Sequence, residues 1–114
     1  MNKKIIGNFG ESFAKKYLEK KGYTILETNW RFNHKELDII AYKNGLICFE
    51  VKTRSTDSNP AWTILKINQV GRLRLSLQAY CQLKHFDYNL SQLDLLVITI
   101  KDKITITVKH YPNI

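Results

Sequence analysis

Apolar residues recur at helical spacing in two parts of the chain, and elsewhere they alternate or run together as in strands. Residues 8–21 predict a first helix, which Asn8 caps and Gly22 ends in a left-handed turn. The later predicted elements are a strand over 23–32, two strands of a hairpin within 36–54, a helix from Pro60 to about Leu83, and strands over 92–101 and 104–111.

This succession gives the order α-β-β-β-α-β-β. A strand–helix–strand crossover between residues 46 and 100 favours a parallel strand pair, while the hairpin within 36–54 is antiparallel. The length of 114 residues suits one domain, residues 1–114. We therefore predict a single α/β domain with a mixed sheet and helices packed on it.

The turn of the hairpin decides whether two acids of its strands share a face. A two-residue turn at Asn44-Gly45 sets Asp38 opposite Val51, on the wrong face. A three-residue turn over 43–45, with Gly45 left-handed as in a G1 bulge, sets Asp38 opposite Glu50, with Cβ atoms about 5 Å apart. We predict the three-residue turn, because only that register lets the two carboxylates share one ion.

Lys52 shares the face of Glu50, because successive side chains of a strand point to opposite sides. Two carboxylates suit Mg²⁺ or Mn²⁺, which take hard oxygen ligands, waters and phosphate oxygens. Lys52 would hold an attacking water and offset charge growing on a phosphorus centre. The alternative is an ordinary salt bridge of a surface hairpin. The apolar residues around Asp38 and Glu50 favour the ion site, since an unpaired charge there is costly.

Glu11 borders the apolar face of the first helix. It serves either as a first-turn acid that complements the helix dipole or as a third carboxylate at the metal site, and its position leaves both alternatives open. Asp94, near the start of the strand over 92–101, is interpreted as a charge at a strand end.

Several basic or polar residues are candidates for nucleic-acid contact, each with a simpler alternative. Lys15, Lys16 and Lys66 are solvated charges or phosphate ligands, and Arg31 is a sheet-edge charge or a phosphate ligand. Gln69, a polar residue in an apolar stripe, bonds backbone at the sheet edge or serves the site. The candidates are Arg31, Arg54, Lys15, Lys16, Lys66 and Gln69.

The chain carries a formal net charge of +8 and a sequence pI of about 9.6, so it should attract polyanions. No apolar run approaches a membrane span or a secretory signal, and we expect no membrane partner. Cys48 and Cys81 lack the spacing of a metal motif and are read as small buried residues of a reducing, cytoplasmic protein.

In these residues the chain resembles the YraN (UPF0102) family of uncharacterised proteins. The resemblance rests on Gly10-Glu11, Asn29 with Arg31, the run 36–41, and the run 49–54. That family is placed in the PD-(D/E)xK, or restriction-endonuclease-like, superfamily and is similar to archaeal Holliday junction resolvases. Lys35 is a departure, since the family commonly has Gly there.

The resemblance implies a restriction-endonuclease-like mixed β-sheet flanked by helices. It also implies that Asp38 and Glu50 ligate a divalent metal, that Lys52 is the catalytic lysine, and that Glu11 is an additional acid of the site. A homodimer is a further expectation, because the related resolvases act as dimers.

Two functions from different classes follow. The first is a Mg²⁺- or Mn²⁺-dependent endonuclease that hydrolyses phosphodiester bonds in nucleic acid, with branched or damaged DNA as candidate substrates. The second is a nucleic-acid-binding accessory module that keeps this fold with little or no catalysis.

Overall fold

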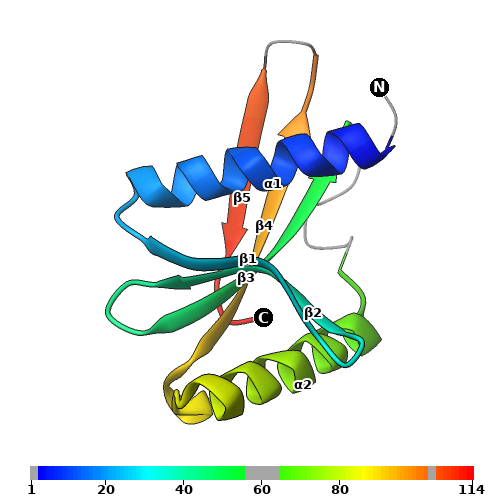
Figure 1. Cartoon of the computed structure of the whole chain (residues 1–114). Helices are drawn as coiled ribbons and strands as arrows, with labels where there is room; N and C mark the ends of the chain where they lie inside the picture. Colours follow the sequence, from blue (N-terminus) through cyan, green and yellow to red (C-terminus); the bar gives the residue numbers. More distant parts are fainter. Residues whose placement is uncertain (1–2, 56–64, 103–104) are drawn as a thin grey trace.

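The computed structural model describes residues 3–55, 65–102 and 105–114. Two helices lie on opposite faces of a five-stranded sheet (Figure 1). This is the α/β class and element order predicted from the sequence, with a short 3-10 helix added before the fourth strand. The elements are α1 (Lys3–Lys20), β1 (Thr24–Phe32), β2 (Lys35–Tyr42), β3 (Leu46–Arg54), α2 (Ile67–Lys84), η2 (Tyr88–Leu90), β4 (Gln92–Ile100) and β5 (Ile106–Tyr111).

The strands stand in the sheet in chain order, from β1 at one edge to β5 at the other. Neighbours are antiparallel except for β3 and β4, which run parallel and are joined through α2. The mixed sheet and its one parallel pair are therefore as the crossover argument predicts.

Side chains of β3 alternate between two cores. Phe49 and Val51 pack with Leu18 of α1, while Cys48 packs with Tyr80 of α2 on the other face. Both cysteines of the chain are buried free thiols. Because β3 is covered on both faces, a charged side chain on it has little access to water.

The first helix begins at Lys3 and not at Asn8, so the predicted cap is wrong. Its early turns run beside the end of β3, where Ile6 and Gly7 line a hollow together with Thr53. The helix thus extends on the N-terminal side of Asn8, so the Asn8 side chain does not stand at a helix end. At its other end Gly22 has a φ of 94°, as predicted for a left-handed helix end.

The second helix begins at Ile67, after an extended Lys66, so a helix continuous from residue 60 is wrong. Pro60 itself lies outside the described residues. Among the helices described, none is long and apolar enough to cross a membrane.

The hairpin turn has the predicted three residues, since Tyr42 pairs with Leu46. Two residues of the turn have positive φ, Asn44 at 57° and Gly45 at 151°. The compact left-handed conformation expected of Gly45 therefore falls on Asn44, which tolerates it better than most residues. The register that carries Asp38 toward Glu50 is confirmed.

Candidate active site

The site forms where β2 and β3 separate. Their ladder ends at the pair Ile39–Phe49, and one residue further the Asp38 carboxylate accepts a hydrogen bond of 2.9 Å from the backbone N–H of Val51. The side chain of Asp38 thus takes the place of a strand-to-strand bond. It is held on β3, one residue from Glu50, as the register implies.

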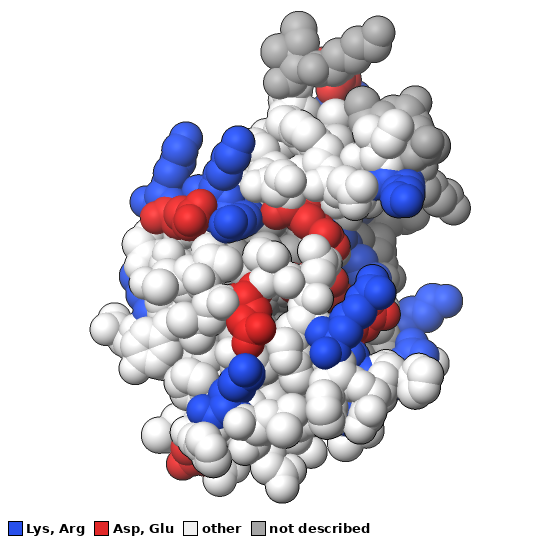
Figure 2. Space-filling view, in the orientation of Figure 1, with Lys and Arg blue, Asp and Glu red and all other residues white. Residues whose placement is uncertain are grey.

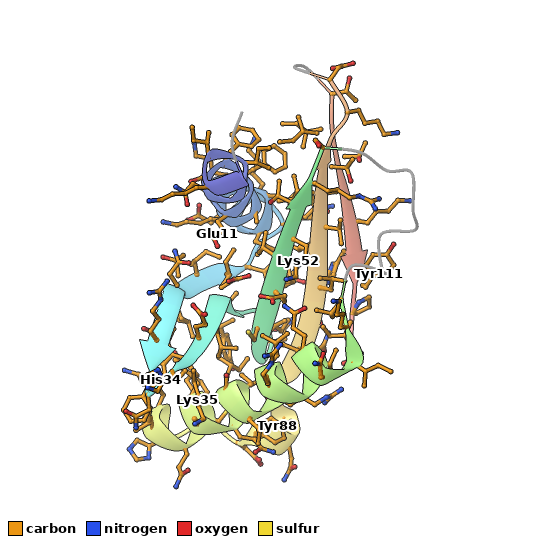
Figure 3. The ribbon with its side chains drawn as sticks, turned by 90° about the vertical axis from the view of Figure 1, so that its right-hand side faces the viewer. Glu11, His34, Lys35, Lys52, Tyr88 and Tyr111 are labelled. Atoms are coloured by element: carbon orange, nitrogen blue, oxygen red, sulfur yellow. The ribbon has the colours of Figure 1, made fainter. Side chains whose placement is uncertain are left out.

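An open hollow of about 480 Å³ occupies this separation. Figure 3 shows Glu11 pointing down from α1 toward the space beside β3, where Lys52 lies. Helix α1, the β1–β2 turn, β2, β3 and α2 all contribute to the lining. The lining residues are Glu11, His34, Glu36, Asp38, Glu50, Val51, Lys52, Gln69, Arg72, Leu73 and Ser76.

Glu50 is the most enclosed charge of the site, with 7% of its surface exposed. Its Oε2 accepts a 3.0 Å hydrogen bond from Nε2 of Gln69 and lies 3.8 Å from Nζ of Lys52. Burial, followed by the neighbouring Asp38 carboxyl, raises the pKa of Glu50 to about 9, and Lys52 and Gln69 act in the opposite direction. The fold therefore holds a carboxyl group where negative charge is poorly tolerated.

Glu11 approaches Asp38 and the hollow from the opposite face of the sheet, because α1 lies close against β3. A Cβ atom on the preceding Gly10 would stand 1.8 Å from Oγ1 of Thr53, so only glycine fits there. Burial, followed by the charge of Asp38, raises the pKa of Glu11, whereas a side-chain hydrogen bond with Asn29 lowers it. The dipole-only alternative for Glu11 does not match this position, since α1 begins eight residues earlier in the chain.

The hollow concentrates negative charge within a basic protein. Four acids line it (Glu11, Glu36, Asp38 and Glu50), out of ten in a chain of net charge +8. Figure 2 shows lysine and arginine side chains standing out from one face with acidic side chains set between them. Such a cluster weakens the attraction of a basic protein for a polyanion, and a bound cation would offset this effect.

The predicted nucleic-acid contacts divide into two groups. Lys15 lines a second hollow that shares Glu11 and Asp38 with the first, and Arg54 lines another that shares Glu11 and Lys52. Nε of Arg54 also donates a 3.0 Å hydrogen bond to Oγ1 of Thr99.

The remaining candidates do not line the main hollow, apart from Gln69. Arg31 is exposed and lies 3.4 Å from Glu36, and Lys16 and Lys66 are exposed and do not line the main hollow. Gln69 donates to Glu50, so the alternative that it serves backbone at the sheet edge is wrong.

Sequence reasoning missed several lining residues. Arg72 and Ser76 follow Gln69 by three and seven positions, so helical spacing could have indicated them. His34 lies in the β1–β2 turn, where no motif marks it as a site residue. Asn29 has a φ of 52° within β1, a backbone conformation that no sequence pattern indicated.

Among the described residues, no three His, Cys, Asp or Glu side chains are grouped closely enough to hold a metal by themselves. The donor set that converges here is the pair Asp38 and Glu50. Two carboxylate ligands with waters and substrate oxygens are an ordinary set for Mg²⁺, so the donor chemistry fits that ion.

Comparisons with known proteins agree on one family. The model of "Uncharacterised protein family UPF0102" matches residues 10–99. A UPF0102 protein of Bacteroides fragilis, BF0634, is 41% identical over 85 residues, which cover 73% of this chain and 70% of that protein. The UPF0102 protein FP2501 of Flavobacterium psychrophilum is 58% identical over 52 residues, 45% of this chain and 44% of its own.

The match thus spans less than half the length of the Flavobacterium relative. A solved structure titled "Crystal structure of SSO0001" aligns with 96% of this chain and 52% of its own, at a TM-score of 0.44 and 19% identity, a likeness too low to establish a shared function. Because the family model covers residues 10–99 and includes every acid of the hollow, the chain belongs to the uncharacterised protein family UPF0102.

Proposed function

We propose that this chain is a Mg²⁺- or Mn²⁺-dependent endonuclease that hydrolyses phosphodiester bonds in nucleic acid, with DNA as its substrate. One observation carries the proposal. The carboxylates of Asp38 and Glu50, the ammonium group of Lys52 and the carboxylate of Glu11 converge on one open hollow. The resemblance to PD-(D/E)xK nucleases, which rests on these same positions, supports it.

The charge distribution supports a cation at this place. The raised pKa of Glu50 reports an environment that disfavours its ionised form, and Asp38 contributes to that environment. A divalent ion would relieve the repulsion between the two carboxyl groups. Bound between them, it would supply a Lewis acid that lowers the pKa of a water and neutralises charge on the phosphate.

The chain's own residues prepare the site. The Val51 N–H orients Asp38, and Gln69 orients Glu50, so neither carboxylate has to be ordered when substrate arrives. Lys52 stands at 3.8 Å from Glu50 with its side chain about one-third exposed, where it can hold an attacking water and interact with the phosphate. Arg72 lines the same hollow and offers a second cation to the phosphate.

The proposal is tested by incubating the purified chain with branched, single-stranded and duplex DNA in Mg²⁺ or Mn²⁺. We expect cleavage that EDTA stops and that Asp38→Ala abolishes. Glu19→Ala is the matched control, because Glu19 is an exposed acid of α1 outside the hollow. Absence of cleavage on every substrate, or equal cleavage by Asp38→Ala, would refute the proposal.

A second candidate function is favoured by the net charge of +8. A nucleic-acid-binding accessory module would bind DNA in a salt-dependent way, because phosphate contacts release counterions. It would show no metal-dependent turnover. The two candidates are separated by Mn²⁺ titration calorimetry, in which only the nuclease is expected to show a site that Asp38→Ala removes.

A further inference from the structure

The β1–β2 turn stands at the mouth of the candidate active site. It is a two-residue turn with positive φ at Asn33 (47°) and His34 (64°), closed by the pair Phe32–Lys35. His34 and Glu36 line both the carboxylate hollow and a separate hollow over this turn, here called the turn hollow. Lys35, the first residue of β2, does not have a positive φ. This backbone therefore does not require the glycine that the family commonly has at this position.

A polymer bound at the carboxylates would continue over this turn. Asp38 lies three positions after Lys35 on β2, a path of about 10 Å, which one or two nucleotides can span. The turn hollow is lined by Arg31, Phe32, Asn33, His34, Lys35 and Glu36. The side chains of these residues would therefore face the nucleotides beside the scissile phosphate.

The turn hollow contains an aromatic ring, that of Phe32, and the positive charges of Arg31 and Lys35. Phe32 leaves 43% of its surface exposed, and its ring stacks on that of Trp30 at 6.3 Å and 20°. Trp30 is fixed in turn by an edge contact of 5.2 Å with Tyr80 of α2. The Phe32 ring is thus a supported aromatic surface, paired across the strands with the basic residue Lys35 and lining the same hollow as Arg31. A single exposed aromatic needs no explanation, but one that is backed by a second ring and placed on this groove has the form of a base-stacking platform.

We infer that Phe32 stacks on an unpaired base next to the scissile phosphate, so that the site takes nucleic acid whose strand is single there. Bases inside a duplex are covered on both faces by their neighbours and cannot stack on a protein ring. The inference rests on the proposed function for the position of the phosphate, and it names the substrate class of that site.

The test is binding in EDTA, where no hydrolysis competes, measured by fluorescence anisotropy with labelled single-stranded DNA, single-stranded RNA of the same sequence and blunt duplex DNA. We expect Phe32→Ala to weaken single-strand binding about tenfold and to leave duplex binding unchanged, since one stacked base contributes roughly a factor of ten or more. The DNA and RNA arms show which strand is preferred. Tyr42→Ala is the matched control, because Tyr42 is 45% exposed at the opposite end of β2.

Two further variants keep the inference testable if Phe32→Ala unfolds. Phe32→Leu keeps an apolar side chain without a ring and is expected to lose single-strand affinity, whereas Phe32→Tyr is expected to retain it. Equal affinities of the Leu and Tyr variants, or equal losses on duplex and single strand, would overturn the inference. A chain that shows these binding differences but never cleaves in Mg²⁺ would leave the stacking role standing and remove the proposed hydrolysis.

Discussion

The side-chain amide of Gln69 donates a 3.0 Å hydrogen bond to Oε2 of Glu50, and this bond joins α2 to the middle strand of the sheet at the candidate active site. Glu50 is largely removed from water, so Gln69 replaces part of the solvation that the carboxylate loses. The bond also fixes which carboxylate oxygens face the hollow.

We expect Gln69→Ala to lower Mn²⁺ affinity by about tenfold, the usual effect of losing a residue that orients a metal ligand. Titration calorimetry measures this directly. Gln82→Ala removes the same side chain from an exposed position of α2 and should leave Mn²⁺ affinity unchanged. Equal affinities for the wild type and Gln69→Ala would show that the Gln69 bond does not prepare Glu50 for a metal.

Glu50 should also make the stability of the metal-free protein depend on pH. Its pKa rises from an ordinary value of 4.5 to about 9 on folding, chiefly through burial and then through Asp38. The folded state thus holds the proton more tightly than the unfolded state. The stabilising contribution is complete below about pH 4.5 and is lost as the pH rises toward 9.

Glu50→Gln cannot ionise and lacks this loss. Its free energy of unfolding, relative to that of the wild type, is therefore expected to increase between pH 5 and pH 8.5, by about 1 kcal/mol or more. Urea denaturation in EDTA at several pH values measures the difference. Glu36→Gln changes an exposed acid of the same hollow and should show no such trend. A pH-independent difference for Glu50→Gln would contradict the expected environment of this carboxyl group.

Gly10 and Gly7 lie one helical turn apart on α1 but differ in their surroundings. A Cβ on Gly10 would collide with Thr53, whereas one on Gly7 would meet no atom within 4 Å. We expect Gly10→Ala to destabilise the fold by about 1–3 kcal/mol through overpacking. Gly7→Ala should stabilise it by up to about 1 kcal/mol, because alanine is the better helix former.

Thermal and urea unfolding of the two alanine variants test this pair. Gly10→Ala should in addition reduce cleavage, because it moves α1 and with it Glu11 away from Asp38. Combining it with Thr53→Ala should recover part of the lost stability, since the closest clashing atom is Oγ1 of Thr53. Equal stabilities of the two glycine variants would mean that α1 does not rest on β3 at this point.

The sequence predicted the central relationship of the site because that relationship depends on local register. The alternation of side chains on β3 and the length of the 43–45 turn suffice to bring Asp38 toward Glu50. Both depend only on residues that are neighbours in the sequence. The contribution of Glu11 needed the approach of α1 to β3, which depends on Gly10 meeting Thr53 across 43 positions of the chain. Patterns of apolar residues give the faces of a helix but not how closely it lies.

The same limit explains the boundaries and residues that were missed. Helix α1 starts at Lys3, five residues before Asn8, although Asn8 has the better capping side chain. Asn29 holds a positive φ within β1, and nothing in its neighbouring residues marks a strand that bends there. Asp94 was interpreted as a charge at a strand end, yet only 1% of its surface is exposed.

In the part of the chain that the structure describes, a further polar arrangement joins Asp94 of β4, which is buried, to His110 of β5, whose side chain is 31% exposed. Nε2 of His110 lies 2.6 Å from Oδ2 of Asp94, and Oδ1 accepts hydrogen bonds from Gln92 Nε2 at 2.8 Å and from the backbone N–H of Asn113 at 3.1 Å. Gln92 belongs to β4 and His110 to β5, and Asn113 follows β5 in the chain. The carboxylate therefore ties β5 and the segment after it to β4.

Removing His110 should leave this buried carboxylate without its ring partner. We expect His110→Ala to destabilise the fold by about 1–2 kcal/mol, because the His110 ring is partly exposed to water and because Gln92 and Asn113 still donate to Asp94. Lys109→Ala, an exposed neighbour on β5, should change stability by less than about 0.5 kcal/mol. Urea unfolding compares the two variants. The double variant Asp94→Asn with His110→Ala should be destabilised by less than the sum of the single changes. An asparagine at position 94 carries no charge that the loss of His110 could leave unpaired. Strict additivity would show that the two side chains do not stabilise each other.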